Sequence, residues 1–160
     1  MFIFWIFAGF AGVEIFSYAA HRWLFHGPLW RIHRSHHVAR RGLFEANDLF
    51  TLLFSAVTIS LLVFAESPLT NSVSFPLGLG IALYGLLYFI AHDLFTHRRF
   101  LAFRSKNGIL LTVRAAHQRH HQTAAKRGIE PFGLFLFNFG KFRRKNAGEN
   151  PGRAPLAERN

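Results

Sequence analysis

Three nearly uninterrupted apolar stretches alternate with polar segments along the chain, and they cover residues 2–20, 49–65 and 73–91. None of the three contains a lysine or an arginine. Each is long enough to cross a bilayer as a helix, for which about 17 to 25 residues are needed. The pattern predicts an all-α integral membrane protein with three to four membrane-embedded helices, the fourth depending on a shorter apolar segment.

That shorter segment covers residues 129–139, which is too short to span a bilayer as a helix. It fits a re-entrant or interfacial segment, or else a core helix. Residues 1–145 are expected to form a single membrane domain. Residues 146–160 are rich in glycine, proline, asparagine and charge, and they predict a disordered tail. Gly78 and Gly80 favour close helix packing over a dinucleotide-binding loop, which would need a third glycine.

The charged residues indicate how the chain is oriented in the membrane. The net charge is +11, and all 19 lysines and arginines lie within residues 22–41, 98–127 and 141–159. Basic segments beside apolar spans are typical of the cytoplasmic face. We therefore expect an inner (cytoplasmic) membrane protein whose first residues and residues 66–74 face outward. No nucleic-acid partner is expected, because nucleic-acid binders spread their basic residues over a soluble surface.

Ten histidines provide the candidate chemistry, and their spacing repeats. The pattern H-x4-H followed by H-x2-H-H occurs twice, and its members are His21, His26, His33, His36, His37, His92, His97, His117, His120 and His121. Neutral imidazole is a versatile ligand for transition metals, and two octahedral ions offer about twelve coordination positions. Ten imidazoles would leave about two positions open, as an oxygen-activating iron requires. Structural zinc fits less well, because its four-coordinate shell is closed.

Helix geometry decides which histidines can converge. Residues at i, i+3 and i+4 share one face, so each H-x2-H-H triplet can project its rings to one side, the second from a helix expected over residues 109–122. Residues five apart diverge by about 140° on a regular helix, so each H-x4-H pair requires the helix to end or bulge. Gly27 and Pro28 fit a helix end after His26, whereas no such breaker adjoins His97. Asp93 adjoins a histidine and is expected to orient an imidazole.

The order of the histidine clusters resembles that of the bacterial β-carotene hydroxylases, within the fatty-acid hydroxylase and sterol desaturase superfamily of membrane di-iron enzymes. The match includes His-Arg-Trp-Leu-Phe-His-Gly-Pro at residues 21–28, His-Arg-Ser-His-His at 33–37 and Phe-Glu-Ala-Asn-Asp at 44–48. It continues through residues 92–100 and 116–121 and weakens beyond residue 122.

The resemblance implies hydroxylation of carotenoid β-ionone rings at C3, which turns β-carotene into zeaxanthin through β-cryptoxanthin. It implies two iron ions held by the ten histidines in a cytoplasmic helical cap, with O2 as co-substrate. Asp93, Asp48 and Asn47 are our candidates for positioning the ligands. The chain has no cysteine for an iron–sulfur cluster, so ferredoxin with its reductase is the expected electron donor. Membrane lipid and a lipid-soluble carotenoid are the other expected partners.

Two alternatives stay open on the sequence. One is another membrane di-iron hydroxylase or desaturase that acts on a fatty acyl chain, a sterol or a different carotenoid position. The other is a non-enzymatic membrane protein that handles metal. The apolar stretches contain Glu14 but no internal histidine cluster, whereas transporters place ionisable groups near the bilayer midplane, which argues against the second alternative.

Overall fold

The computed structural model describes residues 1–39, 42–101 and 103–143, and its regular elements over these residues are all helical. The prediction of an all-α chain is therefore confirmed for this part, while the expected tail at 146–160 lies outside the described residues. In chain order the elements are α1 (Phe2–Ala19), η1 (Ala20–Phe25), α2 (Trp30–His37), α3 (Asp48–Val63), α4 (Ser74–Tyr88), η2 (Phe89–Thr96), α5 (Gly108–His120) and α6 (Phe139–Phe142).

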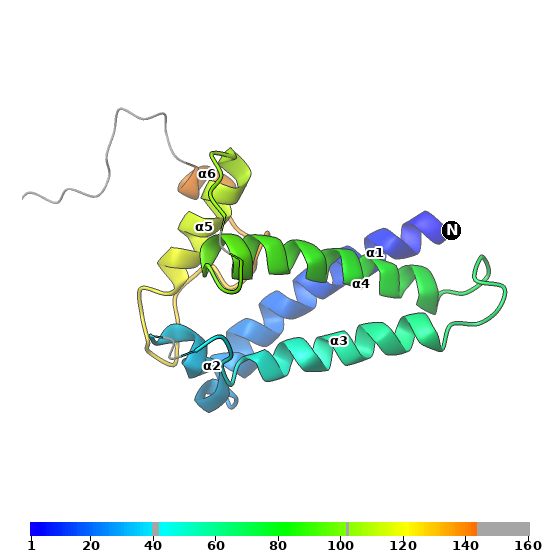
Figure 1. Cartoon of the computed structure of the whole chain (residues 1–160), viewed down its shortest axis with the longest axis horizontal. Coiled ribbons are helices and arrows are strands. Elements are labelled where there is room, and N and C mark those ends of the chain that lie inside the picture. Colours follow the sequence, from blue (N-terminus) through cyan, green and yellow to red (C-terminus); the bar gives the residue numbers. More distant parts are fainter. Residues whose placement is uncertain (40–41, 102, 144–160) are drawn as a thin grey trace, which may run out of the picture.

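The three long helices α1, α3 and α4 form an elongated bundle, as Figure 1 shows. The short helices α2, α5 and α6 gather at one end of this bundle, and the N-terminus lies at the other. Because α2 and α5 carry five of the ten histidines, and His121 directly follows α5, most of the candidate metal ligands lie at this end.

Helix α4 packs against both other long helices through glycines. A Cβ atom at Gly80 would lie 2.1 Å from the backbone oxygen of Ile6 in α1, and one at Gly9 would lie 2.3 Å from that of Leu77. On the α3 side, a Cβ at Gly78 would meet leucine side chains at 3.0 Å. Only glycine allows backbones to approach so closely, so the packing role predicted for Gly78 and Gly80 agrees with the structure.

The backbones of α1 and α3 do not approach each other closely. Both are fully described, and no Cα atom of one lies within 8 Å of a Cα atom of the other. Two aromatic pairs bridge this side of the bundle. Phe16 and Phe54 meet edge to face with ring centroids 5.8 Å apart, and Phe25 stacks on Phe50 at 3.9 Å.

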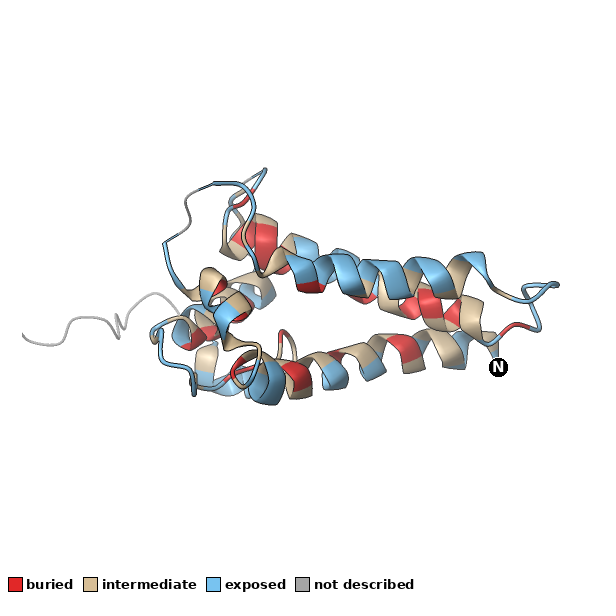
Figure 2. Ribbon diagram, turned by 90° about the horizontal axis from the view of Figure 1, so that it is seen from below, coloured by how far each residue is buried: buried red, intermediate tan, exposed pale blue. Residues whose placement is uncertain are grey.

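The outer faces of the bundle are apolar, which indicates a membrane protein. The continuous helices Phe2–Phe25 and Ser74–Thr96 are long and apolar enough to cross a bilayer, and Asp48–Val63 is a shorter apolar helix. Much of α3 is exposed in Figure 2, including Leu49, Leu52, Leu53, Val57, Ile59 and Val63, each at least half exposed. Water would disfavour this surface, whereas lipid would not. The number of spans and their orientation stay predictions.

The segment before α6 is not a helix, which rules out the core-helix alternative for residues 129–139. Its backbone is held by a carboxylate of α1 instead: Glu14 Oε1 accepts hydrogen bonds from the backbone N–H groups of Phe135 at 2.9 Å and Leu136 at 2.7 Å. Glu14 is buried, and these bonds satisfy one of its two carboxylate oxygens inside an apolar bundle, while Oε2 has no hydrogen-bond partner among the described residues. The segment is thereby fixed against α1 beside the histidine end.

Candidate metal centre

Two π-helical turns bring the paired histidines onto common faces. In η1 the backbone N–H of His26 donates to the carbonyl of His21 at 3.0 Å, and in η2 that of His97 donates to His92 at 2.8 Å. A π-helix closes its hydrogen bonds five residues back, so residues five apart lie above one another. The predicted distortion is present in both pairs, although no glycine or proline marks the second.

The first H-x2-H-H triplet lies on α2, and the second lies at the end of α5 with His121 as its C-cap, so that helical spacing turns the rings inward. His33 and His36 are buried on α2, and His120 is fully buried on α5. Helix α5 begins where Asn107 caps it: the side-chain oxygen accepts from the N–H groups of Ile109 and Leu110. The helix predicted over residues 109–122 is thus present with nearly the same bounds.

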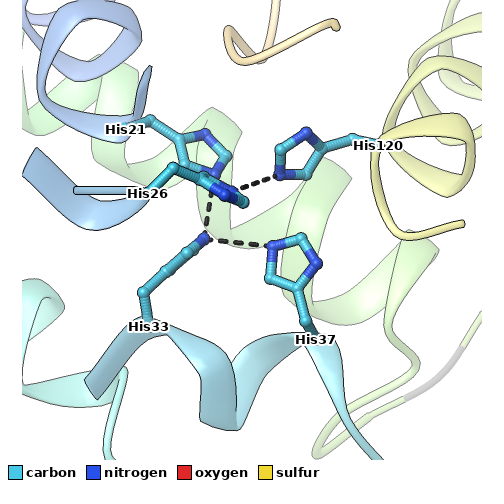
Figure 3. Close-up of side chains that lie close together, drawn as sticks. All are labelled: His21, His26, His33, His37 and His120. Carbon is cyan, nitrogen blue, oxygen red and sulfur yellow. Dashed lines mark hydrogen bonds between the residues drawn. The ribbon is translucent and has the colours of Figure 1, made fainter. Parts of the chain in front are cut away.

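Five histidines form a first cluster, which we name group 1 and which Figure 3 shows. Its members are His21, His26, His33, His37 and His120, and one ring nitrogen of each lies within 4.8 Å of all the others. The Nε2 atoms of His21 and His33 are 3.0 Å apart, those of His26 and His120 are 3.1 Å apart, and those of His33 and His37 are 3.2 Å apart.

A second cluster, group 2, lies beside the first. His36, His92, His97 and His117 bring one nitrogen each within 4.8 Å of the others. Nε2 atoms are 3.1 Å apart between His36 and His92, and 2.8 Å apart between His97 and His117. The ring of His121 lies 4.4 Å from that of His117, and its buried Nε2 has no hydrogen-bond partner among the described residues. We therefore assign His121 to group 2.

The two halves of the sequence repeat exchange one ligand candidate each. His36 from the first half joins group 2, and His120 from the second half joins group 1. The groups touch where His37 and His121 stack, with ring centroids 4.4 Å apart and planes 11° from parallel. All ten predicted histidines are thus brought together in two adjoining groups, although their binding of metal stays a prediction.

Outward hydrogen bonds fix which nitrogen of each imidazole faces the interior. Seven histidines direct Nδ1 at an oxygen acceptor, namely His21, His26, His33, His36, His37, His92 and His120. A neutral imidazole carries one proton, and an oxygen that only accepts requires that proton on Nδ1. The inward Nε2 atoms therefore carry lone pairs, as metal-ligating histidines do.

This assignment makes several close nitrogen contacts repulsive unless a cation lies between them. His21 donates from Nδ1 to the carbonyl of Phe132 at 2.6 Å, and His33 donates to Asn47 Oδ1 at 2.7 Å. Neither has a proton left for the 3.0 Å contact between their Nε2 atoms. His36 and His92 face each other in the same way, with carboxylates behind both. The residues present therefore fit two metal cations, one in each group.

Group 1 is held mainly by backbone carbonyls of the segment that follows α5. The acceptors are Thr123 for His37, Lys126 for His26, Ile129 for His120 and Phe132 for His21. Because backbone oxygens bear no side-chain signature, the sequence analysis did not identify these contacts. They attach this non-helical segment to the histidines at η1, α2 and α5.

Group 2 is held by carboxylates instead. His36 Nδ1 donates to Glu45 at 2.6 Å, and His92 Nδ1 lies 3.3 Å from Asp93 Oδ1. The predicted positioning role of Asp93 thus has a matching contact, as does that of Asn47 at His33. Asp48 instead accepts from the backbone N–H of Glu45 and from Arg99.

Arg99 ties these carboxylates together, and the sequence analysis missed both it and Glu45. Its guanidinium donates to both oxygens of Asp48 at 2.8 and 2.7 Å and to Asp93 at 3.2 Å, and it lies 3.8 Å from Glu45. Only 4% of Arg99 is exposed. A signal was available: Glu45 and Asp48 are two of only eight acidic residues, and they lie three apart.

The backbone around Arg99 is strained, which shows how firmly the fold holds it. Arg98 and Phe100, its two neighbours, have φ angles of 51° and 50°, a left-handed conformation unfavourable for such residues. Each such residue costs on the order of 1–3 kcal/mol and persists only when surrounding contacts impose it. Between these two residues the Arg99 side chain is buried, while that of Arg98 is exposed.

Burial keeps the histidines neutral and so able to bind metal. Desolvation, reinforced by neighbouring histidines, lowers the pKa of His33 and His120 to about 3 and that of His121 to about 2. Desolvation likewise lowers the pKa of His37 to about 4 and that of His36 well below its usual range. At neutral pH these rings therefore present lone pairs and no positive charge.

A cavity of about 560 Å³ leads from the histidines into the bundle between α1, α3 and α4. Its wall at the chemical end includes histidines of both groups, among them His21, His33, His92 and His117. Its other walls are mostly apolar, with Phe50, Phe54, Ile59, Leu62, Ile81 and Leu134 among them. An apolar molecule in this cavity would place one end against both groups.

Comparison with known proteins identifies the family. A model of the fatty acid hydroxylase family matches residues 6–144, which include all ten histidines. The chain belongs to the fatty acid hydroxylase family. Both histidine groups and the cavity therefore lie within the part that the chain shares with this family.

The chain is also similar to several individual proteins of known name. The β-carotene hydroxylase of Pantoea ananas is 36% identical over 136 residues, which are 82% of this chain and 74% of the relative. That of Pseudescherichia vulneris is 38% identical over 127 residues, 77% of this chain and 68% of the relative. The chloroplastic β-carotene 3-hydroxylase 2 of Arabidopsis thaliana is 41% identical over 128 residues. The match covers 78% of this chain but only 42% of that plant protein. No solved structure matches the chain.

Proposed function

We propose that this protein is an O2-dependent monooxygenase that hydroxylates carotenoid β-ionone rings at C3, converting β-carotene into zeaxanthin through β-cryptoxanthin. The observation that carries the proposal is the continuity of an apolar cavity with both histidine groups. The relatives named as β-carotene hydroxylases, at 36–41% identity, support the choice of substrate. An acyl chain or sterol would fit the apolar cavity equally, so the relatives decide between these substrates.

Group 1 and group 2 would each hold one iron ion through inward Nε2 atoms. Bound there, the pair of ions would supply the activation of O2 that carbon–hydrogen oxidation needs. The protein's own contribution is positional: carbonyls of residues 123–132 orient the rings of group 1, while Glu45 and Asp93 orient His36 and His92. Such outer contacts fix the tautomer and make the ligands more basic.

The reaction balances only with an external reductant. One oxygen atom of O2 enters the C–H bond to form the alcohol, and the other leaves as water after uptake of two electrons and two protons. The sequence has no cysteine to hold an iron–sulfur cluster, which supports delivery of the electrons by a separate protein. We propose ferredoxin with its reductase, which would dock near the basic residues around the histidine end. Under the same proposal, this end faces the cytoplasm and α1, α3 and α4 cross or enter the bilayer.

The apolar walls of the cavity would keep water from the reacting carbon. Tyr88 helps to set the boundary, because its ring stacks on His92 with centroids 4.3 Å apart and its hydroxyl lies 3.1 Å from His92 Nε2. Phe132 closes the other side: its ring lies 5.5 Å from that of His21 and its carbonyl accepts from the same histidine. A β-ionone ring would lie between these aromatic surfaces and the two ions.

Pigment analysis in a carotene-accumulating bacterium tests the proposal. Wild-type protein should convert β-carotene into β-cryptoxanthin and zeaxanthin, and purified protein should contain about two iron ions per chain. His36→Ala and His120→Ala should abolish hydroxylation, since each removes a candidate ligand from a different group. Gln118→Ala is the matched control, because Gln118 is an exposed neighbour on α5. Unchanged carotene with the wild type would refute the proposed reaction, and full activity in either histidine variant would remove that residue from the metal site.

A further inference from the structure

Only one side of the large cavity is formed by exposed residues. The lining residues that are exposed are Thr51, Ser55, Ile59, Gly85 and Phe89. Three of them belong to α3 and two to the continuous helix of α4 and η2. Every other described residue of the wall is buried or half-buried, including all those from α1. A residue that is both cavity wall and exterior surface lies at a mouth, so the cavity opens between α3 and α4.

The helix register places the two exposed stripes opposite each other. Helices α3 and α4 follow each other in the chain and run in opposite directions, as Figure 1 shows. They pack where a Cβ at Gly78 would lie 3.0 Å from the Leu62 side chain. About two helical turns from this contact in each helix, on the same face, lie Ser55 and Gly85. Along α3 the mouth extends from Ile59 to Thr51, or about 12 Å.

Gly85 keeps the middle of the mouth free of side-chain atoms. A Cβ built at Gly85 meets nothing within 4 Å, unlike one at Gly78 or Gly80. Glycine weakens a helix interior, and no packing contact requires it at this position. The residue level with it, Ser55, is also small. The small pair therefore leaves a gap in the wall that larger side chains would close.

The surface around the mouth is apolar. Leu52 on α3 and Leu86 on α4 are exposed by 67% and 55%. At the histidine end, the ring of Phe89 lies 6.0 Å from that of Phe100, which lies 6.1 Å from that of Phe44. Phe44 and Phe100 are both exposed. A hydrocarbon that crosses the mouth would therefore meet apolar side chains on both flanks, and lipid is the surrounding that such a surface tolerates.

The sides of the cavity that involve α1 are closed. Toward α4, a Cβ at Gly9 or Gly80 would lie within 2.3 Å of a backbone oxygen of the facing helix. Toward α3, the rings of Phe16 and Phe54 meet edge to face, and Phe25 stacks on the buried Phe50. A rod-shaped molecule has no comparable opening on these sides among the described residues.

A second cavity, of about 270 Å³, also reaches the histidines, but its walls are polar. Glu45 and Arg99 line it together with histidines of both groups. The guanidinium of Arg99 forms buried ion pairs with Asp48 and Asp93. A hydrocarbon beside these charges would remove water from them at a large desolvation cost. This cavity therefore suits small polar molecules and not a carotenoid.

The length of the substrate requires an opening of this kind. The α3 wall of the large cavity, from Phe50 to Leu62, is about 18 Å long at 1.5 Å per helical residue. A C40 carotenoid has about 25 bonds between its two C3 atoms, or about 30 Å at roughly 1.2 Å per bond of an extended chain. With one ring at the histidines, part of the polyene must lie outside the cavity.

We propose that the gap between α3 and α4, centred on Ser55 and Gly85, is a lateral portal through which the carotenoid passes between the lipid and the cavity. The polyene lies in this portal while one ring is at the histidines. This inference rests on the proposed function, because it takes the length of the substrate from it. Gly85 is assigned as the residue whose missing side chain keeps the portal open.

A removable block at Gly85 tests the portal. The sequence has no cysteine, so Gly85→Cys can be labelled specifically with a bulky aromatic methanethiosulfonate, which a reductant removes again. The readout is β-carotene that co-purifies with iron-loaded protein in the absence of an electron donor. Labelled Gly85→Cys should take up at least tenfold less pigment than the same protein before labelling, and reductant should restore uptake. Conversely, bound β-carotene should slow the labelling of Gly85→Cys at least tenfold.

Gly12→Cys is the matched control. Gly12 is an exposed helical glycine of α1 whose Cβ would also meet nothing within 4 Å, and it does not line the cavity. Its label should not change pigment uptake, and bound pigment should not change its labelling rate. Equal uptake by labelled and unlabelled Gly85→Cys would overturn the portal, as would a labelling rate that bound pigment leaves unchanged. Failure of the wild type to take up any carotene would instead overturn the proposed substrate, so the two failures are distinguishable.

Discussion

Replacement of Arg99 by lysine should weaken one metal site and leave the other unchanged. The guanidinium spans Asp48 and Asp93 and lies 3.8 Å from Glu45, and the last two carboxylates orient His92 and His36 of group 2. Lysine keeps the positive charge but offers one compact donor, which cannot bridge separated carboxylates in a fixed plane. Group 1 relies on Asn47 and on backbone carbonyls, which Arg99 does not contact in the described structure.

The expected size follows from these contacts. Loss of an oriented outer contact typically costs 10- to 100-fold in metal affinity, or about 1.4–2.7 kcal/mol. Removing the charge as well would leave buried carboxylates unpaired, at about 3–5 kcal/mol, and endanger folding. The conservative Arg99→Lys substitution is therefore the informative one, and we expect group 2 alone to lose affinity by 10- to 100-fold.

Anaerobic titration of metal-free protein with Co2+, followed by its visible absorption, would resolve the two sites. Arg98→Lys is the matched control, because Arg98 is the adjacent arginine and its side chain is exposed. The wild type and this control should give the same two binding phases, whereas Arg99→Lys should shift only one. Equal weakening of both phases, or of neither, would refute the assignment of Arg99 to group 2.

Three further predictions concern packing, the cavity and pH. Gly9→Ala brings a Cβ to 2.3 Å of the α4 backbone, below the 3.0 Å that real contacts respect, so overpacking of about 1–3 kcal/mol should lower the melting temperature by several degrees. A Cβ at Gly12 meets nothing within 4 Å, so Gly12→Ala should leave the melting temperature unchanged. Equal melting temperatures of the two variants would contradict the close packing of α1 on α4 at Gly9. Ser55→Phe should fill the cavity and reduce hydroxylation at least tenfold. Ser60 lies outside the cavity wall, so Ser60→Phe should leave hydroxylation unchanged. Equal activities of the two variants would exclude this cavity as the substrate site. Because His121 has a folded pKa of about 2, against about 6.5 when unfolded, the unfolded chain takes up its proton first as pH falls. Thermal unfolding of metal-free protein should therefore occur at lower temperature from pH 6.5 downward, and a constant midpoint between pH 7 and 4 would contradict this.

The sequence alone predicted the elements whose signals are local. The apolar stretches became α1, α3 and α4, and the histidine spacings required the distortions found in η1 and η2. The π-turn that contains His92 has no glycine or proline within it, so only the five-residue spacing of His92 and His97 indicated it. Spacing could show that imidazoles converge, but not that His36 and His120 change places between groups.

Contacts that depend on the folded backbone were beyond prediction from one sequence. Four carbonyls behind group 1 come from residues 123–132, where any residue type would offer the same oxygen. Arg99 looked like one of many basic residues beside a span, and only its inward turn distinguishes it from Arg98. The sequence gives the chemistry of each side chain, whereas the fold determines which partner a buried charge has.

The crossing of His36 and His120 between the groups has a consequence for how the protein is made. During synthesis, the first half of the chain exposes four of the five imidazoles of group 1 but lacks the fifth until α5 has emerged. Group 2 conversely consists of histidines from the second half of the chain together with His36 of α2, so it forms only when α2 packs against that half. Under the proposed function, neither iron shell can close on a partly translated chain. Iron loading is therefore postponed until both halves of the newly made protein have met.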